Sequence, residues 1–156
     1  MSPTTQDLLA RLDAPMAAAA RVPLDDPARA RDALEAAYPF DGPDARALRE
    51  ALVTGVRDGT LCDRGKDPVR YSRLAKPGAT PHDLSVDFVW MSGPGIHHRH
   101  PRSEVNLCFA VEGTARFDGH PEGWVVFAPG TRHVPTVTAG RMLIVYFLPG
   151  GEVEWL

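Results

Sequence analysis

The chain has 156 residues, with 17 Lys and Arg against 20 Asp and Glu, which gives a formal charge of −3. Hydrophobic residues make up 44% and charged residues 24%, as in an ordinary globular domain. A chain without a basic excess is a poor match for nucleic acid. The longest apolar stretch, Met142 to Leu148, is much shorter than the ~20 residues that cross a bilayer. With no basic and apolar signal at its start, the chain is expected in the cytoplasm, away from membranes.

Residues 1–60 have apolar side chains at helical spacing. A short helix is predicted from Thr5 to Leu12, and a second from Pro27 to Ala37, where proline suits the first turn. A third helix is predicted after the breaker Asp41-Gly42-Pro43-Asp44, with one face formed by Ala45, Leu48, Leu52 and Val56. We therefore expect an N-terminal α-helical extension over residues 1–60 and a second unit over residues 61–156.

The second unit has a different composition. Short segments rich in Val, Phe, Tyr and Thr alternate with turns, and the whole chain contains 14 Gly and 15 Pro. Such dense turn signals favour an antiparallel sandwich or barrel over a parallel α/β sheet. Seven strands are predicted, over Val69–Leu74, Ser85–Met91, Glu104–Val111, Thr114–Phe117, Trp124–Phe127, Val134–Thr138 and Arg141–Leu148.

Three of the six histidines lie within four residues, at His97, His98 and His100. Side chains two apart in a strand share a face, so His98 and His100 are expected to project together. Glu104 begins the next predicted strand, and His133 follows a turn. Imidazole nitrogens with a carboxylate oxygen suit Fe, Mn, Ni, Co or Zn, without selecting one of them. A register slip of one residue would replace His98 by His97.

The sequence also fits other interpretations of these residues. His98, His100, Glu104 and His133 could form a hydrogen-bonded polar cluster without a metal. Cys108 has the same strand orientation as Glu104 and could line a cavity, although a cysteine in a strand is more often a small buried apolar residue. The remaining histidines, His82 and His120, lie in turn-like segments and are expected in solvent. Two cysteines do not make a disulfide framework.

The second unit resembles a cupin. The first cupin motif, G-x5-H-x-H-x3,4-E-x6-G, is matched by Gly93, His98, His100, Glu104 and Gly113, with one residue fewer before His98 and two more after Glu104. The second motif, G-x5-P-x-G-x2-H-x3-N, is matched by Gly123, Pro129, Gly130 and His133. It lacks one residue after Pro129 and has Val137 in place of Asn. The resemblance implies a mainly β, single-domain jelly-roll barrel with His98, His100, Glu104 and His133 as the metal ligands.

A narrower resemblance extends over nearly the whole chain. A small cupin after about sixty helical residues, with the segments HHRHPRSE, APGTRHVPTVTAGRM and YFLPGGEVEW, is similar to the 4-hydroxylaminobenzoate lyase family. Members convert 4-hydroxylaminobenzoate and water to 3,4-dihydroxybenzoate and ammonia in nitroaromatic breakdown. The resemblance implies a metal-dependent lyase acting on a small aromatic carboxylate, and the cupin resemblance implies a homodimer.

Residue roles follow from this expected chemistry. Glu104 and His133 are the predicted catalytic residues, at the metal that would polarise the hydroxylamino oxygen. An arginine can bind a substrate carboxylate through two parallel hydrogen bonds, and an aromatic residue of the last long strand could face the pocket. The predicted substrate-binding residues are therefore Arg99, Arg116, Arg141 and Tyr146.

The same ligand set suits two other functions. One is an Fe(II)-dependent cupin dioxygenase acting on a small aromatic or thiol substrate. The other is a ligand-binding cupin without catalysis. Oxygen distinguishes the two enzymes, because the lyase reaction is redox-neutral overall and a dioxygenase stops without oxygen. Binding of a small molecule without chemical change would favour the non-catalytic protein.

Overall fold

The computed structural model describes residues 3–76, 78, 82–151 and 153–156. Three helices come first: α1 (Thr5–Arg21), α2 (Pro27–Ala37) and α3 (Pro43–Arg57). The strands are β1 (Arg64–Lys66), β2 (Val69–Ala75), β3 (Leu84–Met91), β4 (His98–Arg99), β5 (Glu104–Phe117), β6 (Gly123–Phe127), β7 (Arg132–His133), β8 (Val137–Pro149) and β9 (Glu154–Trp155). Within the described ranges, no helix is both long enough and apolar enough to cross a bilayer.

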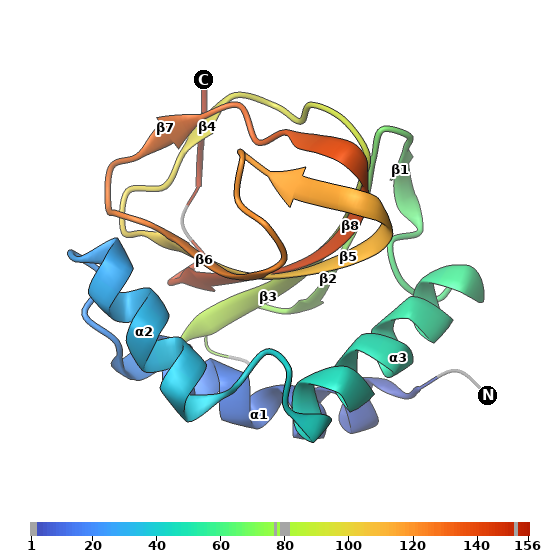
Figure 1. Ribbon diagram of the computed structural model, residues 1–156, viewed down its shortest axis with the longest axis horizontal. Helices are drawn as coiled ribbons and strands as arrows, with labels where there is room; N and C mark the ends of the chain where they lie inside the picture. Colours follow the sequence, from blue (N-terminus) through green and yellow to red (C-terminus); the bar gives the residue numbers. More distant parts are fainter. Residues whose placement is uncertain (1–2, 77, 79–81, 152) are drawn as a thin grey trace.

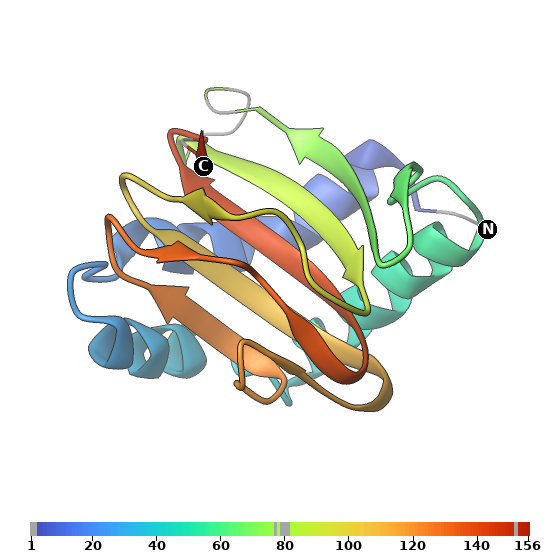
Figure 2. The same ribbon diagram turned by 90° about the horizontal axis from the view of Figure 1, so that it is seen from above.

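The strands form two antiparallel sheets. A six-stranded sheet has the order β1-β2-β3-β8-β5-β6, and a three-stranded sheet has the order β7-β4-β9. Figure 1 shows the helices along the outer face of the larger sheet, with β4 and β7 on its other side. Figure 2 shows the long strands running side by side above the helices. The structure confirms the expected mainly β barrel with helices at its N-terminus.

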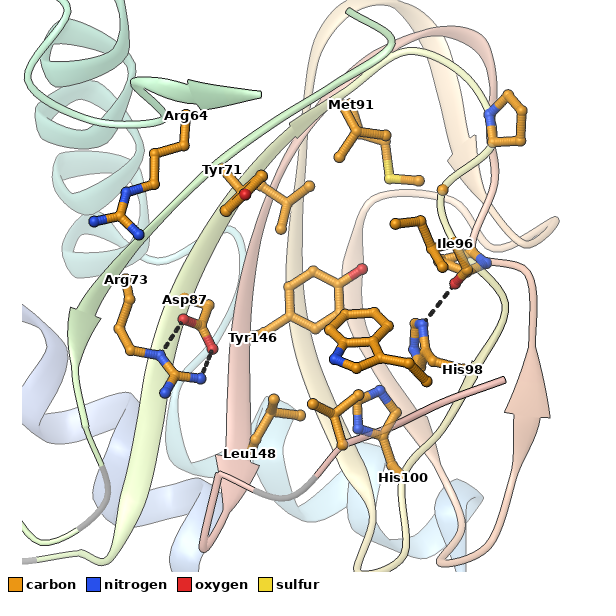
Figure 3. Close-up of a pocket in the computed structure, with 17 residues that line it drawn as sticks. Arg64, Tyr71, Arg73, Asp87, Met91, Ile96, His98, His100, Tyr146 and Leu148 are labelled. Atoms are coloured by element: carbon orange, nitrogen blue, oxygen red, sulfur yellow. Dashed lines mark hydrogen bonds and ion pairs between the residues drawn. The ribbon is translucent and has the colours of Figure 1, made fainter. Parts of the chain in front are cut away.

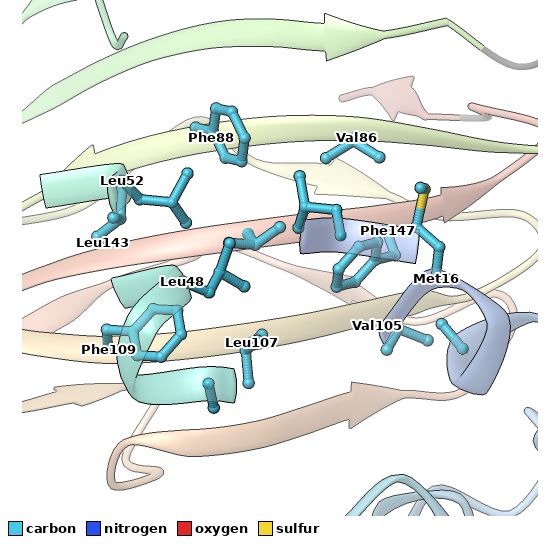
Figure 4. Close-up of a cluster of buried hydrophobic side chains, with 14 of the residues drawn as sticks. Met16, Leu48, Leu52, Val86, Phe88, Val105, Leu107, Phe109, Leu143 and Phe147 are labelled. Atoms are coloured by element: carbon cyan, nitrogen blue, oxygen red, sulfur yellow. The ribbon is translucent and has the colours of Figure 1, made fainter. Parts of the chain in front are cut away.

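Strand alternation gives the larger sheet two apolar faces. Phe88 on β3, Leu143 on β8 and Leu107 on β5 belong to the cluster that packs against the helices. Figure 4 shows this cluster between the sheet and the helices. Neighbouring residues of the same strands, such as Ile144 and Cys108, belong to a second buried cluster on the opposite face. The opposite face therefore forms the interior of the barrel, where the candidate site lies.

The helices attach to the outer face through buried apolar stripes. Leu8 and Leu12 of α1 and Leu48 and Leu52 of α3 are each at most 1% exposed. Helix α1 continues past the predicted end at Leu12, because the alanine-rich segment that follows has high helix propensity. The ends of α2 agree with the prediction, and the third predicted helix is α3.

The strand predictions differ from the structure mainly in length. The segments predicted as Glu104–Val111 and Thr114–Phe117 form one strand, β5, whose register shifts next to Gly113. Gly113 has a φ of +68°, a conformation that glycine adopts without steric cost. The predicted strand Val134–Thr138 is wrong at its start, because β8 begins at Val137. Strands of two or three residues, such as β9, are too short to show an alternating pattern.

Candidate metal centre and cavity

Four side chains selected from the sequence meet inside the barrel. One ligand atom from each of His98, His100, Glu104 and His133 lies within 4.8 Å of the others. Glu104 is central, because its Oε1 lies 3.4 Å from His100 Nε2 and its Oε2 lies 2.9 Å from His133 Nε2. His98 Nε2 is 4.0 Å from Glu104 Oε1. The glutamate is fully buried, and the side chains of the histidines are at most 11% exposed.

Strand pairing explains the convergence. β4 and β7 are antiparallel, and His98 lies directly opposite His133 in their register. Two residues after His98, His100 also reaches the cluster, and Glu104 is the first residue of β5. His97 is exposed and is not part of the cluster. The structure thus places His98, and not His97, beside the other three residues.

Hydrogen bonds to Nδ1 orient two of the imidazoles. His98 Nδ1 donates to the carbonyl oxygen of Ile96 at 2.9 Å, and His133 Nδ1 donates to Asp118 Oδ2 at 2.6 Å. Each bond directs Nε2 toward the cluster, the usual arrangement around metal-binding histidines. Asp118 was not predicted from the sequence. In the sequence, Asp118 is explained by a turn alone, because aspartate tolerates the positive φ of +48° found there. Nothing in the pattern of residues therefore indicated a contact with His133.

The four residues fit a divalent first-row metal. His98 Nε2 is buried and has no hydrogen-bond partner among the residues that the structure describes. A buried polar atom without a partner costs free energy, and a metal ion would satisfy this atom. Three imidazole nitrogens and one carboxylate oxygen suit such an ion. The donor set does not distinguish Fe from Mn, Ni, Co or Zn.

The contact between Glu104 and His133 shifts the pKa of both side chains toward their charged forms. Burial raises the pKa of Glu104, but hydrogen bonds from His100 and His133 outweigh this effect and hold the pKa below its usual value. Burial lowers the pKa of His133, while hydrogen bonds to Asp118 and Glu104 more than compensate and raise this pKa to about 9. At neutral pH a carboxylate and an imidazolium therefore lie in contact.

A cavity of about 670 Å³ opens beside the cluster. Figure 3 shows its residues, which come from the inner face of the larger sheet, from β4 and from β9. The lining residues are Arg64, Val69, Tyr71, Arg73, Asp87, Val89, Met91, Pro94, Gly95, Ile96, His98, His100, Pro135, Tyr146, Leu148, Val153 and Trp155. Its size and apolar walls are typical of small-molecule sites.

Of the four residues predicted to bind substrate, Tyr146 lines this cavity. Tyr146 is 7% exposed, and burial is the main reason why the pKa of its hydroxyl is raised well above its usual value. The hydroxyl therefore stays protonated and can donate a hydrogen bond. Cys108 is fully buried in the apolar cluster and is not among the cavity residues.

The three predicted arginines lie outside the described cavity lining. Arg99 Nη1 lies 2.8 Å from Glu154 Oε2, and Arg141 Nε lies 2.8 Å from Glu112 Oε2. Arg116 Nη1 donates to a backbone carbonyl in its own turn. In this structure each guanidinium is engaged with groups of the protein.

Trp155 and Arg64 line the cavity but are not among the residues that the sequence predicted to bind substrate. Trp155 reaches the site because β9 pairs with β4, with Trp155 opposite His98 in register and their ring centroids 5.7 Å apart. Arg64 lies on β1 at the other edge of the larger sheet. Both belong to strands of two or three residues, whose pairing only the tertiary structure determines.

The comparisons with known proteins agree with the resemblance inferred from the sequence. Residues 16–155 match the family model "PnbB: 4-hydroxylaminobenzoate lyase". A 4-hydroxylaminobenzoate lyase of Nocardioides sp. (strain LMS-CY) is 31% identical over 112 residues, which cover 65% of this chain and 66% of the relative. A 4-hydroxylaminobenzoate lyase of Pseudomonas putida is 28% identical over 135 residues, covering 73% and 77%. The chain thus spans about two thirds to three quarters of these relatives.

A solved structure of an RmlC-like cupin protein from Ralstonia eutropha JMP134 is similar to part of this chain. The match covers 58% of this chain and 61% of the cupin chain. The TM-score is 0.40 and the sequence identity is 16%.

Proposed function

The chain belongs to the 4-hydroxylaminobenzoate lyase family, and from this premise we propose that it is a metal-dependent lyase that converts 4-hydroxylaminobenzoate and water to 3,4-dihydroxybenzoate and ammonia. One observation of the structure supports the proposal most. The buried cluster of His98, His100, Glu104 and His133 lies beside a cavity with aromatic and apolar walls. Such a site can hold a small aromatic ring next to a Lewis acid.

The proposed reaction is balanced without an external oxidant. The N–O bond of the substrate breaks and takes up the two electrons that the ring loses when oxygen adds beside the nitrogen. A second C–O bond forms where the C–N bond breaks, and the nitrogen leaves as ammonia. A divalent ion bound by the cluster would supply Lewis acidity toward the hydroxylamino oxygen. The lyase therefore needs no molecular oxygen.

The residues of the chain have distinct roles in this proposal. His98, His100, Glu104 and His133 would hold the ion, and Glu104 and His133 would also act as the catalytic residues. Of the four, His98 and His100 line the cavity. Glu104 Oε2 and His133 Nε2 lie 2.9 Å apart. Tyr146 would donate a hydrogen bond from its protonated hydroxyl to the bound substrate.

Anaerobic turnover tests the proposal. Purified protein loaded in turn with Fe, Mn, Ni, Co or Zn is mixed with 4-hydroxylaminobenzoate under nitrogen, and ammonia and 3,4-dihydroxybenzoate are both measured. We expect equal amounts of the two products, lost in the His100→Ala variant and kept in the His97→Ala control. Absence of both products from every metal-loaded sample would contradict the lyase. Turnover only after air is admitted would favour the dioxygenase.

The oligomeric state is a separate prediction. We propose a homodimer, as the cupin resemblance implies, and light scattering on the purified protein measures the mass directly. A mass equal to the 17.0 kDa of one chain would contradict the dimer.

A further inference from the structure

The cavity has two chemically different ends. His98 and His100 lie at one end, and Arg64, Arg73 and Asp87 lie at the other, with Tyr146 between them (Figure 3). The metal cluster suits the reacting group of a substrate. The opposite end brings two guanidinium groups and one carboxylate to the same cavity, so its formal charge is positive.

The register of the larger sheet produces this polarity. Arg64 on β1 lies opposite Tyr71 on β2, and Tyr71 lies opposite Val89 on β3. Residues opposite each other in neighbouring strands share a face, so Arg64 is on the inner face with the cavity floor. β5, which begins with Glu104, is four strands away from β1 in the same sheet. At about 4.8 Å per strand spacing, β1 and β5 are separated by roughly 19 Å across the sheet.

The two arginines at this end differ in their partners. Arg73 contacts Asp87 through two hydrogen bonds, with its Nε 2.7 Å from Oδ1 and its Nη2 3.1 Å from Oδ2. This bidentate pair neutralises Arg73 and also leaves Asp87 without a free negative charge. Within the described part of the chain, neither an ion pair nor a hydrogen bond is found for Arg64. Its side chain is therefore the uncompensated positive charge of the cavity.

The region between the two ends is suited to an aromatic ring. Val69, Val89, Met91 and Leu148 supply apolar surface there, and the rings of Tyr71, Tyr146 and Trp155 also line the cavity. A planar apolar ring would displace water from these walls. A ligand that fits both ends has an anionic group on one side of a ring and the reacting group on the other.

We propose that Arg64 binds the carboxylate of the aromatic substrate and so determines specificity for para-substituted benzoates. This inference rests on the proposed function for the identity of the reacting group. Arg64 is an exposed residue of the edge strand β1, and its guanidinium lies on the same side of the cavity as Arg73, at the end opposite His98 and His100 (Figure 3). Arg64 is a specificity residue here, because it contacts the substrate away from the bonds that change.

Turnover of two matched substrates tests the role of Arg64. The Arg64→Gln variant is compared with wild type on 4-hydroxylaminobenzoate and on N-phenylhydroxylamine, which lacks the carboxylate. A hydrogen-bonded charge pair contributes about 1.5–3 kcal/mol, so kcat/KM for the carboxylated substrate should fall about 10- to 100-fold, mainly through KM. The kcat/KM for N-phenylhydroxylamine should be the same in Arg64→Gln as in wild type. Arg57→Gln, which removes an exposed charge at the end of α3, should leave both values unchanged.

Equal loss on both substrates, or no loss on either, would overturn the inference while leaving the lyase function in place. A second measurement separates the inference from that function. Binding of unreactive 4-nitrobenzoate and of nitrobenzene is measured by calorimetry, and Arg64→Gln should weaken only the binding of 4-nitrobenzoate. If wild type shows this Arg64-dependent binding without any turnover, the carboxylate site stands and the proposed reaction fails. If 4-nitrobenzoate binds wild type and Arg64→Gln equally, the carboxylate site is refuted.

Discussion

His133 and Asp118 form a short hydrogen bond beside the histidine cluster, with 2.6 Å between Nδ1 and Oδ2. The other carboxylate oxygen of Asp118 accepts from the backbone N–H of Thr136 at 2.8 Å. Asp118 is thus fixed by the chain on one side and orients the imidazole on the other. This bond joins the turn after β5 to β7 and holds His133 Nε2 toward Glu104.

Loss of this bond should weaken metal binding without removing a ligand. In Asp118→Asn the amide can still accept from Nδ1, but it no longer carries the charge that stabilises the imidazole orientation. Mutation of such outer residues usually lowers metal affinity by about 10- to 100-fold. Competitive titration of the metal-free protein with a coloured chelator measures the change.

Asp67→Asn is the matched control for this titration, because Asp67 is an exposed carboxylate that contacts Arg70 and Arg141 away from the cluster. The control should bind metal as wild type does. Unchanged affinity in Asp118→Asn would show that the His133–Asp118 bond has no part in metal binding.

The neighbouring histidines should differ in their effect on metal content. His98→Ala removes a buried nitrogen of the cluster, whereas His97→Ala removes an exposed ring outside it. We expect His98→Ala to lose most of its bound metal and its turnover, and His97→Ala to keep both. Elemental analysis of the two purified variants gives the answer. The opposite result would mean that β4 is shifted by one residue in the active protein.

Cys62 should be unreactive while the protein is folded. Its side chain is 0% exposed, and burial is the main cause that raises the pKa of its thiol to about 12. The thiolate is the nucleophilic form, so labelling with a disulfide reagent at pH 8 should be slow in buffer and fast in denaturant. Rapid labelling of Cys62 in the native protein, located by mass spectrometry, would contradict its burial.

The same shift predicts a dependence of stability on pH. The folded-state pKa of Cys62 lies above its unfolded value, near 9, so folding favours the neutral thiol. This contribution is fully present below pH 9 and is lost as the pH rises from about 9 to 12. The difference in free energy of unfolding between wild type and Cys62→Ala should therefore decrease over this range. A difference that stays constant in urea titrations across it would contradict the shift.

Gly140 and Gly119 should differ in their tolerance of alanine. Gly140 has a φ of +149°, and a Cβ there would collide with the carbonyl oxygen of Glu112 on the paired strand β5. Gly119 has a φ of +83°, and a Cβ there would meet no atom within 4 Å. We expect Gly119→Ala to cost about 1–2 kcal/mol from backbone strain alone, and Gly140→Ala to cost more. Urea unfolding of both variants tests the order, which equal losses would contradict.

The mainly β class, the N-terminal helices and the four residues of the candidate metal cluster could all be predicted from the sequence. These features depend on local patterns. The spacing of apolar residues along α3 and α2 predicts helices. His98 and His100 are two positions apart, which places them on one face of an extended segment, and Glu104 begins the next predicted strand. His133 required the second motif, since its partner strand is remote in the chain.

The other residues around the cluster and its cavity depend on contacts between segments that are distant in the chain. Asp118 lies 15 positions before His133, Trp155 reaches His98 through the pairing of β9 with β4, and Arg64 enters the cavity through the register of β1 with β2. The arginines selected from the sequence lie in ion pairs or turns instead. Short strands carry no pattern of their own, because their register is set by hydrogen bonds to partners that are distant in the chain.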